Sequence, residues 1–248
     1  MRSTSQCLFN SKRILRLAVI VLITVNISIV ILDIWQHNGS YLPNPIRNLL
    51  NITREDNIGT WFSTSQTLAV AVILWIIFSR VRYEKGPTKS KLAWGIAAGF
   101  FTYASLDDGS KLHERLGSLV DLSSFFPSYP WQVLFVPVFI VIGFLILYIV
   151  VKEMKNKSAK SAIVFGLLLS AVSAVGLDFI EGVPQYSNLT FANLFSENHP
   201  HARHYIKTIE ECIEMLGITM FLAGFGRHLM WTYSEWLIKF ELTDSRRD

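Results

Sequence analysis

The sequence predicts an all-α integral membrane protein, a bundle of about six transmembrane helices that forms one multi-pass domain over residues 1–248. Of the residues, 51% are hydrophobic and only 17% are charged. A soluble domain carries about 25% charged residues. Mean hydropathy is +0.36. The apolar residues also fall in long blocks instead of alternating with charge, which excludes an ordinary soluble domain.

Each block approaches the roughly 20 mainly apolar residues that a helix needs to cross a bilayer. The expected spans are residues 17–34, 61–78, 92–114, 133–151, 162–180 and 207–231. In the third, the apolar run ends at Leu106, but the helical pattern continues through Lys111, and Gly117 is the expected stop. The fourth span contains no charged residue, so we expect it to form a wall that faces lipid.

Basic residues give the orientation of the spans. Of the 23 Lys and Arg residues, 17 lie before the first span, in the second and fourth connections, or at the C-terminal end. Short cytoplasmic loops are enriched in Lys and Arg, so this pattern predicts six crossings with both termini in the cytoplasm. A bacterial inner membrane is expected, because eukaryotic sorting signals are absent. The net charge of +4 is therefore attributed to basic residues that set the orientation of the spans in the membrane. The expected partner is the lipid bilayer and not nucleic acid.

Acidic residues have the opposite distribution, since 13 of the 19 Asp and Glu residues fall on the outer side. One carboxylate in each of four spans lies 16–18 residues from the basic residue at the cytoplasmic end: Asp33, Asp107, Asp178 and Glu211. At 1.5 Å per residue this is roughly 24–27 Å along the helix axis. We therefore expect four carboxylates at similar depth, near the outer boundary of the hydrocarbon core.

These acids and nearby histidines predict a polar pocket that opens outward between the first, third, fifth and sixth spans. The candidate ligands, several of which share a helix face, are Asp107, Asp108, His113, Glu114, Asp178, Glu181, His204, Glu211 and Glu214. Carboxylate and imidazole groups are common metal ligands. A divalent metal ion or another cation is the expected occupant, and a membrane-embedded, metal-dependent enzyme is one form this function could take. No catalytic residue is assigned, although Glu211 or Asp178 would be the general base of such an enzyme.

Two alternatives stay open. The acids could pair with the basic residues on the same side, in a structural or accessory subunit whose cluster is an ion-pair network. Intramembrane acids also mark cation or proton transporters, although the inner halves of these spans are apolar. A stripe of small residues, Gly166, Ser170 and Ala174, leads to Asp178 and predicts that this carboxylate faces protein.

Overall fold

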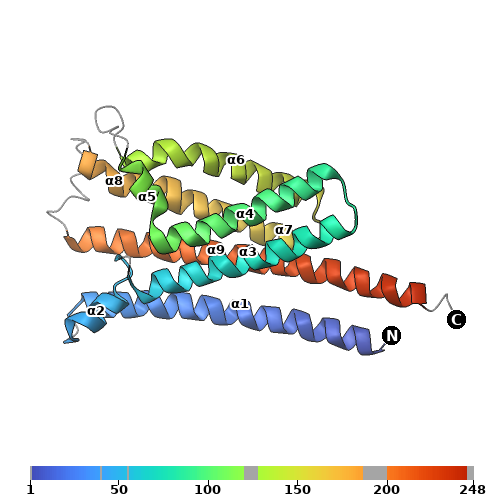
Figure 1. The fold of residues 1–248 in the computed structure, drawn as a ribbon. Coiled ribbons are helices and arrows are strands. Elements are labelled where there is room, and N and C mark those ends of the chain that lie inside the picture. The colour runs from blue at the N-terminus through green and yellow to red at the C-terminus, as the bar shows by residue number, and fades with distance from the viewer. Residues whose placement is uncertain (1, 40, 55, 120–127, 187–199, 245–248) are drawn as a thin grey trace.

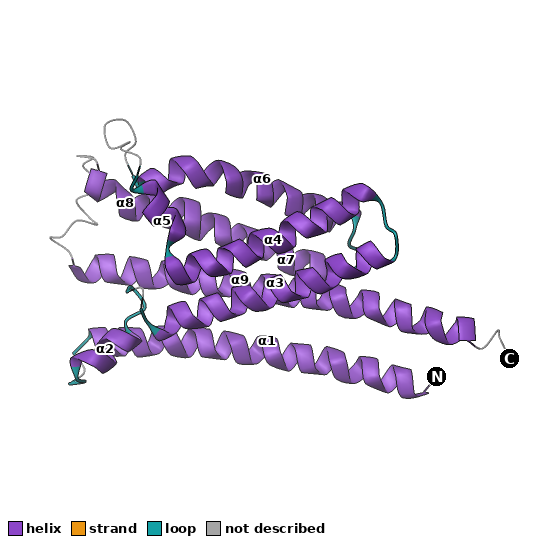
Figure 2. Ribbon diagram, viewed as in Figure 1, coloured by secondary structure: helices purple, strands orange, loops and turns teal. Residues whose placement is uncertain are grey.

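The computed structural model describes residues 2–39, 41–54, 56–119, 128–186 and 200–244. Within its helices, the side chains of residues 2–11, 175, 181, 184–186, 200 and 233–244 lie outside the description. All regular structure in the described residues is helical, as Figure 2 shows. The elements are α1 (Arg2–His37), α2 (Asn44–Leu50), α3 (Ile58–Tyr83), α4 (Thr88–Ser110), α5 (Leu112–Gly117), α6 (Pro130–Lys152), α7 (Lys157–Ala171), the π-helix η1 (Val172–Leu177), α8 (Asp178–Tyr186) and α9 (Pro200–Asp244).

The long helices lie side by side, with the short helices α2, α5 and α8 gathered at one end (Figure 1). Both chain termini lie at the opposite end (Figure 1). Helix α9 is central, because it packs against α1, α3, α7 and η1. Its residues Ala223 and Phe225 are completely buried. The main apolar core lies where α9 packs together with α3, α4, α6 and α7.

Four of the described segments are long and apolar enough to cross a membrane: Lys12–His37, Ile58–Tyr83, Pro130–Lys152 and Lys157–Ile180. They contain the predicted spans 17–34, 61–78, 133–151 and 162–180, which are confirmed as apolar helices of spanning length. The spans predicted at 92–114 and 207–231 are not in this set. Helices α4 and α9 are less apolar along their length, and their buried faces, including Trp94 and Phe225, pack inside the bundle.

The prediction that the third span continues as one helix through Lys111 is wrong. Lys111 has φ +52°, in the left-handed region, and it separates α4 from α5. The turn redirects the chain, so Asp107 and Glu114 do not share a helix face as their spacing predicted. Gly117 does end α5, as expected. Its backbone approaches α6 closely, since an added Cβ would lie 2.6 Å from Cβ of Trp131.

The fifth span runs from α7 through the π-helix η1 into α8. A π-turn adds one residue to a helical turn, and such turns are frequent at functional sites. Two of the small residues of this span, Gly166 and Ser170, contact α9. A Cβ on Gly166 would lie 3.1 Å from the Gly217 carbonyl oxygen, and a Cβ on Gly217 would lie 3.2 Å from Oγ of Ser170. Small residues on both helices therefore allow the close approach of α7 and α9.

Candidate functional site

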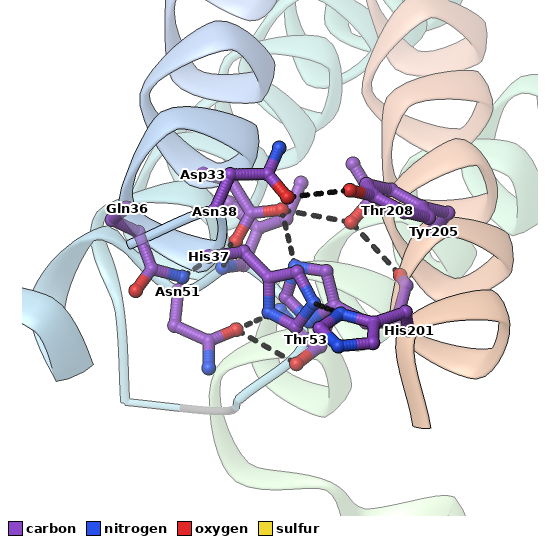
Figure 3. A network of polar contacts seen from close by, with 11 residues as sticks. Asp33, Gln36, His37, Asn38, Asn51, Thr53, His201, Tyr205 and Thr208 are labelled. Carbon is purple, nitrogen blue, oxygen red and sulfur yellow. Dashed lines mark hydrogen bonds and ion pairs between the residues drawn. The ribbon is translucent and has the colours of Figure 1, made fainter. Parts of the chain in front are cut away.

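The Asp33 carboxylate near the end of α1 is the centre of a buried polar network (Figure 3). One oxygen, Oδ2, lies 3.0 Å from Nε2 of His204 and accepts the Thr208 hydroxyl at 2.8 Å. The other, Oδ1, accepts the backbone N–H of Ile52 at 3.1 Å and the side-chain amide of Gln36 at 3.3 Å. Asp33 therefore joins α1 to α9 and to the segment between α2 and α3.

Histidines extend this network toward the end of the bundle. Nε2 of His37 lies 2.9 Å from Nδ1 of His201, and the His37 ring stacks on the His204 ring with 3.7 Å between centroids. Beside them, the Tyr205 hydroxyl donates to the Asn38 side chain at 2.8 Å. Of the predicted ligands, only His204 belongs to this network. The sequence did place Asp33 at the same depth as the other carboxylates. No local sequence pattern, however, indicates that α1 packs against the first turns of α9.

A second network surrounds Asp107, at the end of α4. Its Oδ1 accepts the backbone N–H of His113 at 2.7 Å, and its Oδ2 lies 2.6 Å from Nδ1 of the same histidine. The Tyr103 hydroxyl also donates to Oδ1 at 3.3 Å. The His113 and Trp131 rings pack edge to face, with 4.6 Å between their centroids. Asp107 thus fixes both the backbone of α5 and the orientation of the His113 ring.

The remaining predicted ligands are distributed over other contacts. Glu114 pairs with Lys111 on the surface, with 3.1 Å between Nζ and Oε1. Asp178 accepts the side-chain amide of Gln132 at 2.8 Å, so this carboxylate faces protein as predicted. The side chain of Glu181 lies outside the described residues. The structure therefore does not gather the predicted ligands in one pocket. They contact separate partners on different helices.

Asp108 and Glu214 are brought together at a cavity of about 410 Å³, which we call the α6 cavity. Its walls come from α3, α4, α6, α7, η1 and α9, and they are almost entirely apolar. The described lining runs from Phe100 to Asp108 on α4 and from Glu214 to Phe221 on α9, which is about 12 Å along the axis at 1.5 Å per residue. Both carboxyl groups lie at the end of the cavity nearest α5.

The two carboxyl groups differ in their contacts. Asp108 accepts the Thr64 hydroxyl at 3.1 Å. Glu214, among the described residues, has no hydrogen-bond partner, and its electrostatic neighbours are chiefly Glu211 and Asp108, with Lys207 as the opposing charge. A carboxyl group in apolar surroundings is costly unless it is paired or hydrogen-bonded. The acidic end of the α6 cavity is therefore suited to a positively charged or hydrogen-bond-donating group.

A third polar cluster, which sequence reasoning missed, lies deeper in the bundle. Asn26 donates to Oγ1 of Thr219 at 3.1 Å, Thr219 donates to Gln66 at 2.7 Å, and Gln66 donates back to Asn26 at 3.4 Å. All three residues are buried and come from α1, α9 and α3. This closed ring of hydrogen bonds satisfies its own members, so it joins helices and is not a ligand site.

Metal binding receives no support from the geometry. In the parts of the chain that the structure describes, no three His, Cys, Asp or Glu side chains are grouped so that they could hold a metal ion. Most of the predicted ligands instead have partners of their own, such as His113 for Asp107 and Gln132 for Asp178. The divalent metal ion thus stays a prediction from composition.

These features define an all-helical protein with several helices able to cross a membrane, an apolar cavity among them and two carboxyl groups at one end of that cavity. The chain belongs to the family described as Domain of unknown function (DUF8692), whose model matches residues 14–229. The match extends from the first apolar helix to the central helix α9. No curated protein and no solved structure matches the chain.

Proposed function

We propose that this chain is a six-span membrane protein that binds an amphiphilic organic cation in the α6 cavity. The apolar part of the ligand would lie among the helices, and its positive head would lie between Asp108 and Glu214. One observation carries the proposal: two carboxyl groups border the same end of an otherwise apolar cavity of about 410 Å³. Cavities of roughly 300–1,000 Å³ with a few polar groups are typical of small-molecule sites.

Charge complementarity selects a cation among the possible heads. Near Glu214 the acids Glu211, Asp108 and Glu210 outnumber the single base Lys207. An anionic head would add to the repulsion there, whereas a cation would relieve it. Thr67, Ser170 and Ser173 also line the cavity. This proposal keeps the cation that the sequence predicted, but replaces an inorganic metal ion by an organic cation.

The six-span topology rests on the placement of the helix ends. Both termini lie at one end of the bundle, as an even number of crossings requires (Figure 1). With α4 and α9 as the third and sixth spans, the basic residues gather at that same end, which the positive-inside rule assigns to the cytoplasm. Charge on these two helices is tolerable because much of their surface packs against protein.

Cysteine labelling tests the topology. In a chain with Cys7 and Cys212 replaced by serine, Lys85→Cys would place a thiol between α3 and α4, and Leu119→Cys would place one after α5. Both residues are exposed. A membrane-impermeant maleimide added to intact cells should label Leu119→Cys, and should label Lys85→Cys only after the membrane is opened. Labelling of both in intact cells would refute the topology.

Ligand binding is tested with the purified protein in lipid nanodiscs. Three probes with the same tetradecyl chain differ in the head: a trimethylammonium, an alcohol and a carboxylate. We expect the cation to bind most tightly. Glu214→Gln and Asp108→Asn should each weaken its binding by roughly tenfold, or about 1.4 kcal/mol. Equal binding of all three heads would show that charge does not select the ligand.

A pair of glycine variants tests the location of the site. A Cβ on Gly143, which lines the α6 cavity, would meet no atom within 4 Å, so Gly143→Leu should fill the cavity without displacing the backbone. Gly99→Leu is the matched control, because a Cβ there also has open space and the residue does not line the cavity. Only Gly143→Leu should abolish binding of the cation. Undiminished binding would place the ligand elsewhere.

A further inference from the structure

The outer surface of α6 forms one border of the α6 cavity. Ile140, Phe144 and Leu147 line the cavity, and they are also 52%, 68% and 38% exposed. Across from them, Ala171 at the end of α7 lines the cavity and is exposed as well. Side chains that face both the cavity and the outside lie at its rim. The rim is therefore the gap between the middle of α6 and the end of α7.

In a bilayer this rim would face lipid and not water. Between Pro130 and Val151, α6 carries no charged residue. Both α6 and the segment Lys157–Ile180 are long and apolar enough to cross a membrane. The rim residues lie near the middle of both segments, so the surface around the gap would meet the hydrocarbon chains of the bilayer.

Close packing surrounds the first turn of α6, at the end of the bundle that holds α5 and α8. Trp131 and Gln132, in the first turn of α6, are 6% and 4% exposed. Gln132 is bonded to Asp178, and Gly117 brings the α5 backbone against Trp131. On the far side, Ser128 donates to the backbone carbonyl of Phe179 at 3.0 Å. These contacts join α5, α6 and α8 between the cavity and that end of the bundle.

Small side chains on one side of the gap and a helix irregularity on the other leave room for passage. On the α7 side, Ser170, Ala171 and Ala174 have short side chains, and the π-helix begins directly after Ala171. On the α6 side, Pro137 lies inside the helix, where it removes one backbone hydrogen bond. Gly143 follows it and adds no side chain to the wall. Both features make α6 easier to bend than an uninterrupted helix.

We infer that the ligand of the α6 cavity is a membrane-dissolved, single-chain amphiphile that reaches Asp108 and Glu214 sideways from the bilayer, through the gap between α6 and α7. The inference rests on the proposed function, since it concerns the way into the same site. The apolar chain occupies the gap past Ala171 and Phe144 and the apolar part of the cavity, and the positive head lies between Asp108 and Glu214. Exchange with the surrounding lipid, and not with water, then sets the occupancy.

The test separates access from affinity. The full chain in nanodiscs binds a trimethylammonium probe with a conjugated tetraene chain, whose fluorescence rises in a dry site, and stopped-flow mixing gives association and release rates. Ala171→Trp narrows the gap. Leu168→Trp is its matched control, because Leu168 is exposed on the same helix but does not line the cavity. We expect Ala171→Trp to slow association and release by roughly tenfold each, which is about 1.4 kcal/mol in the barrier. Because Ala171 also lines the cavity, a direct effect on the site would instead speed release.

Each other result has a separate meaning. If the wild-type chain binds the probe but Ala171→Trp leaves both rates unchanged, the lateral route is overturned and the proposed function stands. If Ala171→Trp abolishes equilibrium binding, the residue belongs to the site itself and is not a portal, which also overturns the inference. If the wild-type chain does not bind the probe at all, the proposed function fails and the inference fails with it.

Discussion

Nε2 of His204 lies 3.0 Å from Oδ2 of Asp33, although 171 positions separate the two residues in the chain. The carboxylate is completely buried and has four partners from α1, α9 and the backbone of Ile52. It therefore fixes the end of α1 against the beginning of α9. This contact joins the first long helix in the chain to the last.

Replacing Asp33 by alanine should destabilise the fold strongly. The substitution leaves the His204 ring, the Thr208 hydroxyl and the Ile52 N–H without their acceptor, and breaking a buried pair costs about 3–5 kcal/mol. Reversible unfolding in mixed micelles measures the loss. Asp56→Ala is the control, because Asp56 is 79% exposed beside Arg54 and should change stability by less than about 1 kcal/mol. Similar losses in the two variants would contradict this account.

Thr219→Val should weaken the ring of hydrogen bonds among Asn26, Gln66 and Thr219. The substitution keeps the shape of the side chain but leaves Gln66 and Asn26 each without one partner. Hydrogen bonds between transmembrane helices contribute about 0.6 kcal/mol on average and at most about 1.7 kcal/mol, so we expect a loss in that range. Thr24→Val is the comparison, because Thr24 is exposed and its hydroxyl bonds only to the Ile20 carbonyl of its own helix. Reversible unfolding of both variants in the same micelles measures the two losses, and equal losses would contradict the role of the ring.

Two glycines should respond in opposite ways to alanine. A Cβ on Gly224 would lie 3.0 Å from the Ala159 carbonyl oxygen and would also overlap the side chain of Ile163, so Gly224→Ala should separate α7 from α9 and cost about 1–3 kcal/mol. Gly143→Ala meets open space and removes a flexible residue from a helix, so it should stabilise by about 0.5–1 kcal/mol. Thermal unfolding of the two variants measures both changes in stability. If both variants gained stability or both lost it, the packing described for these two glycines would be wrong.

Asp107→Ala should release α5 without unfolding the bundle. This carboxylate holds both the backbone N–H and the ring of His113, so its loss leaves the six-residue helix α5 with few polar anchors. Hydrogen–deuterium exchange of peptides that cover residues 112–117 should become faster by roughly tenfold, which is about 1.4 kcal/mol in local opening. Glu114→Ala, which removes only a surface ion pair with Lys111, should leave exchange nearly unchanged. Unchanged exchange in Asp107→Ala would contradict the anchoring role.

The sequence by itself determined where most of the helices lie and at which end the acids gather. An uninterrupted run such as Val133–Val151 has no stable alternative to a helix in lipid, because every backbone group must be bonded within the segment. The distance from Arg16 to Asp33 is also a sequence property, since the rise per residue of an uninterrupted α-helix is constant. Both were therefore predictable without coordinates.

Only the tertiary structure decided which side chains meet. Depth along a helix follows from residue spacing, but the rotation of each helix and its neighbours follow from packing across the whole bundle. The left-handed turn at Lys111 directs His113 to Asp107, and the packing of α9 directs Glu214 to Asp108 and the α6 cavity. The predicted single acidic pocket was divided for this reason, because carboxylates at one depth point to different partners when their helices are rotated differently.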